Sequence, residues 1–353
     1  MERIYLNPIA TTGRHNAAES GLPLGGGPLF FNACEVNRRR PRTPDKVERD
    51  TLSVPDLVRV EGAPDWLGAL SAPRPPMAGL SFDTPRLMGV VNVTPDSLFG
   101  GGERAEPGHA VADGKAMWEA GATILDVGGE STRPGAEPVD VDEELRRVLP
   151  VIQGLAESGC RVSVDTRNAR TMREAVAAGA QIVNDVSGLT WDEDAMGAVT
   201  DLGVPVILMH IQGTPRTMQQ SPQYDDPALD VYDALAARVK ACRDAGIPPE
   251  KIGVDPGFGF GKSVAHNMAI LNRLGLYQGL GGPVLLGLSR KSTLAKLSRG
   301  EATADRLPGS LSGALAGAQR GAQILRVHDV AETCQALAVW RATETLEIPE
   351  GVA

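Results

Sequence analysis

The sequence contains only four cysteines, and they are far apart. No two of them have the CxxC spacing, and no group has the spacing of metal ligands. This pattern argues against a disulfide framework or a cysteine zinc site, and it favours four buried thiols in a reducing cytoplasm. The residues are Cys34, Cys160, Cys242 and Cys334.

The sequence also lacks long apolar runs and an excess of positive charge. No apolar run reaches the length of about 18 residues that a membrane span needs. Met1–Leu6 does not have the basic-then-apolar order of a signal peptide, so we expect a cytoplasmic protein. The net charge of −9 argues against broad binding of nucleic acid or anionic membranes. A local basic pocket for a small anionic substrate is compatible with that charge.

The 353 residues, 42% of them hydrophobic, are sufficient for a substantial core. The character of the chain changes near residue 85. Residues 1–84 are rich in proline, glycine and arginine, and we expect an irregular N-terminal extension that packs on the main domain and is partly mobile. The basic run Arg38–Arg42 is expected to form a solvated loop. Residues 85–353 form the main domain. Short strand-like pieces in the extension occur at 4–9, 28–33 and 57–60.

From residue 85 onward, helical segments that end at glycine alternate with short β-branched runs. Glycine is favoured just after a helix because it readily adopts positive φ. The runs are continuously apolar, as expected for a parallel sheet that is buried on both faces. They therefore predict a (β/α)8 barrel, or TIM barrel, with a doubly wound open sheet as the structural alternative. The eight runs lie at 87–93, 123–127, 161–164, 181–186, 204–209, 251–254, 283–288 and 323–327.

Polar residues stand at the end of each predicted strand. In a (β/α)8 barrel, the carboxyl ends of the strands carry the functional site. Some of these residues also suit structural roles, because aspartate is a good N-cap. Asp96, Asp165 and Asp329 are possible caps of this kind, and we expect Asp185 to be structural. The strand-end candidates are Asn92, Asp126, Asp165, Asn184, His210, Asp255, Lys291, Arg326 and His328.

The last predicted strand carries a basic pair. Arg326 and His328 alternate and so point to the same face, where barrels commonly bind phosphate. Asn92, on the first strand, becomes their neighbour when the barrel closes. Its oxygen could serve a Mg²⁺ ion that is otherwise held by phosphates and water.

The middle strands carry groups suited to a heterocycle. Asp165, Asn184 and Asp255 could accept hydrogen bonds from ring and amino N–H groups, and the carboxylates could stabilise positive charge on the ring. Lys291 could contact a ring oxygen or nitrogen. No Ser-His-Asp, Cys-His or HExxH grouping indicates a covalent nucleophile or a catalytic zinc.

The segment Asp255–Lys262 combines a carboxylate, three glycines, two aromatic rings and a lysine. This mixture suits a backbone that comes close to a flat polar ligand, with aromatic walls beside it. A loop that only turns the chain is the simpler alternative. We expect Lys262 to lie at the rim and Lys291 to be the ligand-binding lysine.

As a set, nine motifs over residues 86–345 resemble the dihydropteroate synthases of the pterin-binding (β/α)8 superfamily. The resemblance implies condensation of 6-hydroxymethyl-7,8-dihydropterin pyrophosphate with p-aminobenzoate in folate biosynthesis, with Mg²⁺. It also implies an SN1-like course, in which pyrophosphate leaves before the amine attacks the pterin cation. The motifs are Asn92–Ser97, Leu125–Gly135, Ser163–Arg167, Asn184–Gly188, Met209–His210, Asp255–Lys262, Ser289–Ser292, Gly309–Ser310 and Arg326–Val330.

The same resemblance implies a role for each matching residue. The pterin would be held by Asp126, Asp165, Asn184, Met209, Asp255 and Lys291. Pyrophosphate would be held by Asn92, Arg326 and His328, with Asn92 also on the metal. p-Aminobenzoate would contact Thr132, Arg133, Pro134, Phe258, Gly259, Phe260, Lys291 and Ser292. The residues implied to act in catalysis are Asp165, Asp255, Lys291, Arg326 and His328.

One loop departs from the family pattern. Leu98–Glu103 lacks the aspartate that usually follows the first motif, so we expect weakened but real activity. A pterin-dependent methyltransferase and a pterin-binding pseudoenzyme are the alternatives. The resemblance also implies a homodimer. The small residues of Gly313–Ala318 would let a partner helix approach closely, or they could pack on the barrel itself.

Overall fold

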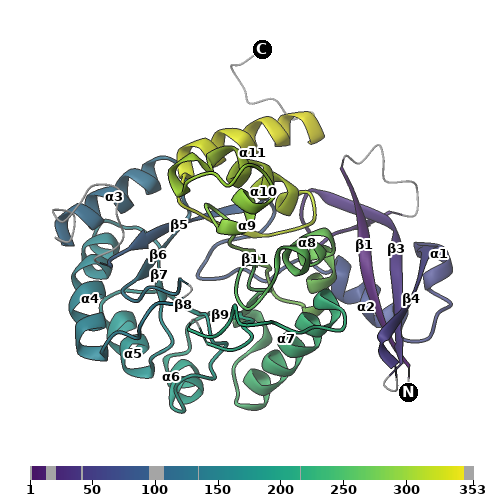
Figure 1. Cartoon of the computed structure of the whole chain (residues 1–353), viewed down its shortest axis with the longest axis horizontal. Helices are drawn as coiled ribbons and strands as arrows, with labels where there is room; N and C mark the ends of the chain where they lie inside the picture. Colours follow the sequence, from purple (N-terminus) through teal and green to yellow (C-terminus); the bar gives the residue numbers. More distant parts are fainter. Residues whose placement is uncertain are drawn as a thin grey trace.

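Eight parallel strands form the centre of the molecule. The computed structural model describes the chain except residues 1, 13–20, 41–42, 95–106, 134, 215 and 346–353. All neighbouring strands pair in parallel, and a parallel bridge between Val254 and Val284 closes the ring. The predicted barrel is therefore confirmed (Figure 1). Its strands are β5 (Arg86–Asn92), β6 (Ile124–Gly128), β7 (Val162–Asp165), β8 (Ile182–Asp185), β9 (Val206–Met209), β10 (Ile252–Asp255), β11 (Leu285–Leu286) and β12 (Ile324–Val327).

Helices surround this barrel and alternate with its strands (Figure 1). The glycines predicted to end them do so with positive φ, for example +65° at Gly203 and +90° at Gly321. The α-helices are α3 (Pro107–Glu119), α4 (Val141–Glu157), α5 (Ala169–Ala177), α6 (Ala195–Leu202), α7 (Pro227–Asp244), α8 (Val264–Asn272), α9 (Ser292–Lys296), α10 (Leu307–Ala318) and α11 (Val330–Thr345). Short 3-10 helices are η2 (Pro249–Lys251), η3 (Leu274–Leu280) and η4 (Thr303–Asp305).

The N-terminal extension is an ordered antiparallel sheet, so the prediction of an irregular segment is wrong. Its strands are β1 (Arg3–Thr12), β2 (Leu22–Pro23), β3 (Leu29–Arg40) and β4 (Thr43–Ser53), followed by α1 (Val54–Leu57) and α2 (Ala63–Ser71). The strand-like pieces at 4–9 and 28–33 lie mainly in β1 and β3. The piece at 57–60 is not a strand, because α1 ends there.

The basic run is not a solvated loop in its described part. Arg38–Arg40 belongs to β3, and the guanidinium of Arg39 lies 2.6 Å from Asp230 on α7. Arg39 is only 11% exposed. The run therefore helps to fix the sheet to the barrel.

Aromatic side chains fill the junction between the sheet and the barrel. Trp66 of α2 stacks on Tyr232 of α7, with ring centroids 5.0 Å apart, and Tyr5 of β1 meets Tyr232 edge-on at 5.8 Å. A side chain at Gly279 of η3 would overlap the Trp66 ring. Buried aromatic pairs of this kind contribute about 0.5–1.5 kcal/mol each beyond the area that they bury. The extension is therefore packed on the barrel through a specific interface.

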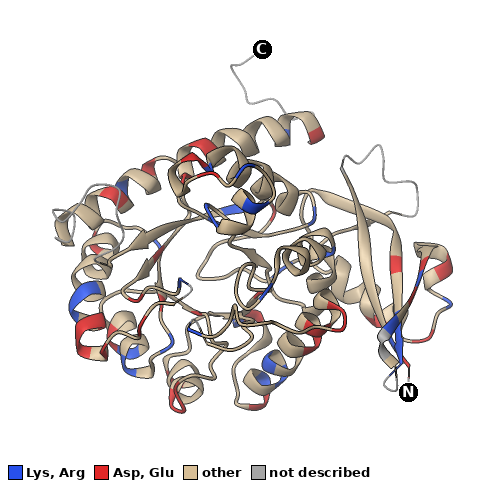
Figure 2. Cartoon of the chain, in the orientation of Figure 1, with Lys and Arg blue, Asp and Glu red and all other residues tan. Residues whose placement is uncertain are grey.

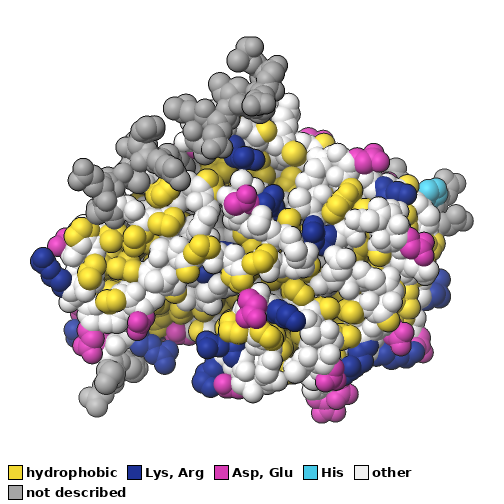
Figure 3. Space-filling view, turned by 180° about the vertical axis from the view of Figure 1, so that it is seen from behind, with side chains coloured by type: hydrophobic (Ala, Val, Ile, Leu, Met, Phe, Trp, Pro, Cys, Tyr) yellow, Lys and Arg dark blue, Asp and Glu magenta, His cyan; other side chains and the backbone are white. Residues whose placement is uncertain are grey.

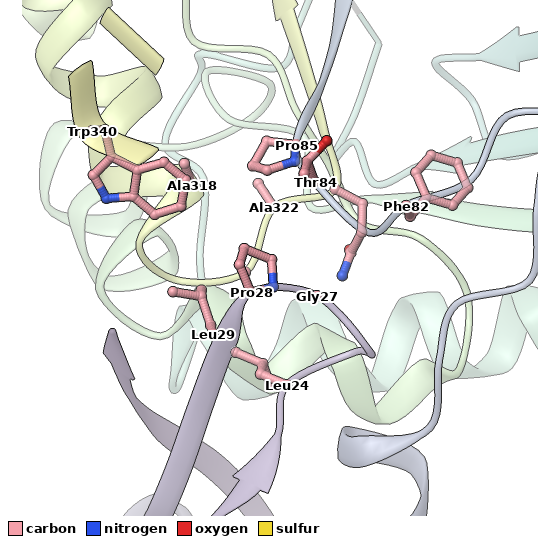
Figure 4. A pocket seen from close by; sticks show the side chains of 12 residues that line it. Leu24, Gly27, Pro28, Leu29, Phe82, Thr84, Pro85, Ala318, Ala322 and Trp340 are labelled. Atoms are coloured by element: carbon pink, nitrogen blue, oxygen red, sulfur yellow. The ribbon is translucent and has the colours of Figure 1, made fainter. Parts of the chain in front are cut away.

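The segment after α2 closes the amino-terminal end of the barrel. Met77, Leu80 and Phe82 share one buried cluster with inward-facing barrel residues such as Met88 and Ile124. Beside them lies a small cavity of about 20 Å³, shown in Figure 4. This volume suits about one water molecule rather than a substrate. The cavity also lies at the opposite end of the barrel from the predicted site, so it is not a candidate site.

The small residues of α10 pack on the barrel. A side chain at Gly313 would overlap Leu288, and one at Gly317 would overlap Leu286. Of the two roles that the sequence allowed for this face, the structure favours packing within the chain. The face therefore gives no support to the predicted homodimer, which stays a prediction.

Three of the four cysteines are buried as expected, and the fourth is not. All four cysteines are free; Cys34, Cys160 and Cys242 are buried, and Cys334 is half-buried. None of the helices in the described part is long and apolar enough to cross a membrane. On the rear face, acidic and basic side chains are interspersed (Figure 3).

Candidate active site

A buried network of charged groups joins β6, β7, β8 and β12 at the carboxyl end of the barrel. Arg326 donates from Nε to Asp126 Oδ2 at 2.7 Å and from Nη2 to Asp165 Oδ2 at 2.8 Å. Asn184 Nδ2 donates to the same oxygen of Asp126 at 3.0 Å. The structure thus brings together four predicted site residues. It also pairs Arg326 with two carboxylates that the resemblance implies for pterin binding, a pairing that the sequence did not predict.

One acceptor atom of this network has no hydrogen-bond partner in the described part of the chain. The side chain of Asp126 is completely buried, and its Oδ1 atom has no hydrogen-bond partner among the described residues. A buried carboxylate oxygen without a partner is costly, by about 1–3 kcal/mol. A ligand N–H group that reached this atom would remove that cost, which suits a heterocycle with amino and ring N–H groups.

Burial controls the ionisation of the second carboxylate. It raises the pKa of Asp165 to about 7, although the charge of Arg326 opposes the shift. Burial would by itself lower the pKa of Arg326, but Asp126 and Asp165 outweigh it, so that pKa is raised. The guanidinium is therefore permanently charged, and it holds both carboxylates in place.

Lys291 and Asp255 form a second cluster beside the first. Lys291 Nζ donates to the carbonyl of Phe258 and lies 4.4 Å from the ring centroid of Phe260. Burial lowers the pKa of Lys291 to about 8, and the nearby charge of Asp255 opposes this. Burial raises the pKa of Asp255, opposed first by Lys291. This arrangement fits the prediction that Lys291 lies at the ligand.

Two predictions for the loop Asp255–Lys262 are wrong. The ring of Phe258 is fully buried in the main core, so it does not provide a wall for a ligand, and only its carbonyl serves Lys291. Lys262 is only 2% exposed and does not lie at the rim. Its Nζ contacts His210 Nδ1 at 3.0 Å and donates to the Phe260 carbonyl at 2.9 Å. Burial lowers the pKa of Lys262 to about 7.

Gly257 is expected to be intolerant of any side chain. Its φ is +70°, and a Cβ atom there would overlap the carbonyl oxygen of His210. Gly257→Ala should lower the free energy of unfolding by about 3 kcal/mol, since backbone strain and steric overlap add. Gly281→Ala is the matched control, with φ +84° and open space around the Cβ position, and should cost about 1 kcal/mol. Equal losses of unfolding free energy in the two variants, measured by urea unfolding, would show that the close approach of Gly257 to His210 does not affect stability.

The phosphate side of the predicted site is centred on His328. Its Nδ1 lies 3.0 Å from Ser289 Oγ, and its main-chain N–H donates to the same oxygen at 3.3 Å. Ser289 is therefore a supporting residue whose role the sequence did not reveal. Asn92 ends β5, next to β12, and is half-buried.

The ionisation of His328 makes a pH-dependent contribution to stability. Burial, followed by the charges of Arg326 and Arg290, lowers its pKa to about 4, and Arg133 adds to this shift to a smaller degree. The unfolded chain binds this proton near pH 6.5, so the free energy of unfolding should fall between about pH 6.5 and 4, by up to about 1.4 kcal/mol per unit. Urea unfolding of wild type and His328→Gln across this window measures the effect. Identical slopes would contradict it.

The loops after β6, β7 and β8 are tied together at the rim. Arg167 makes two hydrogen bonds to Glu130, at 2.8 and 2.9 Å, and its guanidinium lies 3.7 Å from the ring centroid of Trp191. The sequence placed Glu130 and Arg167 in strand-end motifs but gave them no role. These contacts of Arg167 fix the loop that carries Thr132 and Arg133.

The remaining predicted residues are placed as follows. Met209 is buried at the end of β9, Thr132 is half-buried, Arg133 and Ser292 are exposed, and Gly259 and Phe260 are half-buried. Pro134 and the unusual loop Leu98–Glu103 lie outside the described residues, as does Asp96. Asp185 is structural as predicted, because it accepts from the Ser187 and Leu189 main chain at 2.6 and 2.9 Å.

Comparison with known proteins decides between the barrel enzymes that such a site would suit. The pterin binding enzyme family matches residues 88–328. The chain is 45% identical over 265 residues to dihydropteroate synthase of Escherichia coli strain K12, covering 75% of this chain and 93% of that protein. The chain belongs to the dihydropteroate synthase family. The N-terminal sheet precedes the matched residues.

Solved structures of dihydropteroate synthases share the fold. The Xanthomonas albilineans enzyme with 4-aminobenzoic acid has a TM-score of 0.73 and 48% identity, covering 78% of this chain and 99% of that one. The same enzyme with 7,8-dihydropteroate has a TM-score of 0.70 and 46% identity, covering 78% and 100%. The Yersinia pestis enzyme with a sulfonamide drug complex has a TM-score of 0.72 and 43% identity, covering 75% and 96%.

Proposed function

We propose that this chain condenses 6-hydroxymethyl-7,8-dihydropterin pyrophosphate with p-aminobenzoate to give 7,8-dihydropteroate and pyrophosphate. The observation that carries the proposal is the Arg326 network, with its buried and unpartnered Asp126 Oδ1. Related enzymes have been solved with 4-aminobenzoic acid and with 7,8-dihydropteroate. The methyltransferase alternative has no comparable support.

The pterin part of the site binds the ring and stabilises the charge that develops on it. Asp126 Oδ1 is buried without a partner among the described residues and would accept from a ring or amino N–H that reaches it, and Asn184 of the network and Asp255, which lies close to Arg326, would add further hydrogen bonds. As pyrophosphate leaves, the ring becomes cationic. Asp165 and Asp255 in their ionised forms stabilise that cation in a site shielded from water.

The phosphate part of the site consists of Asn92, Arg326 and His328. The described residues contain no group of three His, Cys, Asp or Glu side chains that would hold a metal by themselves. The amide oxygen of Asn92 nevertheless fits Mg²⁺, because this ion keeps waters and takes substrate phosphates as ligands. When bound there, Mg²⁺ would neutralise charge on the leaving pyrophosphate. His328 would offer a neutral N–H donor at pH 7 and take up a proton as the anion binds.

The p-aminobenzoate part of the site would lie between Lys291, Phe260 and Ser292, with Thr132 and Arg133 contributed by the loop after β6. Lys291 stands over the Phe260 ring, so its charge can meet the carboxylate while the ring packs on the benzene. The aryl amine is neutral at pH 7 and already nucleophilic. The site therefore requires no strong base.

We further propose that the protein acts in the cytoplasm as a homodimer, on the strength of its family. Light scattering of the purified protein tests the oligomeric state. A monomer at micromolar concentration would refute that part of the proposal without affecting the reaction.

Removal of divalent metal should abolish most of the activity. Pyrophosphate release by wild type is measured with both substrates and Mg²⁺, then with each substrate omitted and with EDTA. We expect release only with the complete mixture, and a loss of about 100-fold with EDTA that added Mg²⁺ restores. Binding of the pterin pyrophosphate without release would indicate a pseudoenzyme and refute the proposal.

A further inference from the structure

We propose that Arg49, on β4 of the N-terminal sheet, is a positioning residue for the p-aminobenzoate part of the active site. The inference rests on the proposed function and assigns a role to the part of the chain that precedes the family match. It starts from the place where the sheet meets the first turn of α7, at the rim of the carboxyl face.

Arg49 is one of two arginines that hold the N-cap of α7. Its Nη2 lies 2.6 Å from Asp226 Oδ2, and Arg273 Nη1 lies 2.9 Å from the same oxygen. The other oxygen of Asp226 accepts from the main-chain N–H groups of Ala228 and Leu229 at 3.1 and 3.2 Å. Asp226 is nearly fully buried, so this carboxylate is fixed from both sides.

The start of α7 carries several negative charges, which the arginines of the sheet offset. Asp225, Asp226, Asp230 and Asp233 lie close together at the start of α7, and Figure 2 shows acidic residues at the end of this helix nearest the sheet. Like charges this close repel each other, and arginines of the sheet oppose that repulsion. Arg39 lies 2.6 Å from Asp230. Ion pairs from the sheet therefore hold the beginning of α7 in place.

The first turn of α7 is continuous with the preceding loop, which contacts the glycine-rich loop of the predicted site. Tyr224 precedes Asp226 by two positions, and its hydroxyl donates to the carbonyl of Gly261 at 2.8 Å. Farther back in the same loop, Gln219 Nε2 donates to the carbonyl of Gly259 at 2.9 Å. Both hydrogen bonds are accepted by carbonyls of the glycine-rich loop that carries Phe260.

The two loops are in direct contact, so movement of one would displace the other. A Cβ atom at Gly261 would overlap the main-chain oxygen of Gln212, so the two backbones are closely packed there. Phe260 in turn lies under Lys291 Nζ. The path from Arg49 thus runs through Asp226, Tyr224 and Gly261 to the predicted p-aminobenzoate contacts. Of the predicted pterin contacts, Asp126 and Asn184 are on barrel strands outside this path, whereas Asp255 and Lys291 border the glycine-rich loop.

The test compares kinetic constants of full-length variants under the proposed reaction. Arg49→Met and Tyr224→Phe should each raise KM for p-aminobenzoate about threefold to tenfold, with KM for the pterin pyrophosphate within about twofold of wild type. Arg49→Lys should recover part of the loss. Arg38→Met is the matched control, since Arg38 pairs with Asp50 inside the sheet, 2.6 Å away, and should leave both constants unchanged.

Three outcomes would overturn the inference. Unchanged KM for p-aminobenzoate in folded Arg49→Met would do so, as would equal changes in both KM values, which indicate a general structural effect. If Arg49→Met does not fold, Arg49→Lys and Tyr224→Phe decide in its place. Absence of turnover by wild type would overturn the proposed function and this inference with it, whereas an active wild type with insensitive variants overturns the inference alone.

Discussion

Replacement of Arg326 by methionine should reduce kcat/KM by about 1000-fold, because the guanidinium is the shared partner of the carboxylates and is expected to bind the leaving group. It should also lower the free energy of unfolding by about 3–5 kcal/mol, since Asp126 and Asp165 would stay buried without a cation. Their hydrogen bonds to Arg326, at 2.7 and 2.8 Å, are the contacts that are lost. Steady-state kinetics and urea unfolding measure the two effects.

A double variant separates catalysis from stability. Arg326→Met with Asp165→Asn removes one of the two buried carboxyl groups left without a cation, so it should recover part of the stability while turnover stays low. If the double variant regained activity along with stability, Arg326 would be a structural residue only. Arg326→Lys tests the need for two simultaneous contacts, which a lysine cannot reproduce with the same geometry.

Replacement of Lys291 by methionine should reduce kcat/KM for p-aminobenzoate by about 100-fold. The ammonium lies 4.4 Å from the Phe260 ring centroid and donates to the Phe258 carbonyl. Methionine keeps the length of the side chain but removes the charge that is expected to meet the carboxylate. Because a buried ammonium is costly, we expect the melting temperature to be unchanged or higher.

Lys291 immediately precedes α9, and the matched control lies at the other end of that helix. Lys296 is exposed in the last turn of α9, and Lys296→Met should leave kinetics and melting temperature as in wild type. A similar loss in both variants would contradict the assignment of Lys291. So would a loss for Lys291→Met that affected only the pterin substrate.

The barrel could be predicted from sequence because its signals are local. Each strand is a short apolar run, and each preceding helix ends at a glycine that needs positive φ, such as Gly203. The N-terminal sheet was missed because its alternation is interrupted. Phe31 and Cys34 of β3 are both buried although they are three positions apart, because the pairing with β1 shifts between Pro8 and Ala10.

The site was predictable as a set of residues but not as a network. Motif order indicated Asp126 and Arg326 separately, yet they are 200 positions apart, and nothing local in the sequence shows that they are hydrogen-bonded. The direction in which each side chain of a loop points also could not be predicted from the sequence. Phe258 and Phe260 look equivalent there, but one ring faces the core and the other faces Lys291.

The central claim is that this barrel transfers a pterin group to p-aminobenzoate. The most direct measurement is mass spectrometry of the product formed from ring-labelled p-aminobenzoate, with pyrophosphate release followed in the same samples. The account predicts labelled 7,8-dihydropteroate in a one-to-one ratio with pyrophosphate for wild type, and almost none for Arg326→Met. Pyrophosphate release without labelled product, or no reaction by folded wild type with Mg²⁺, would contradict it.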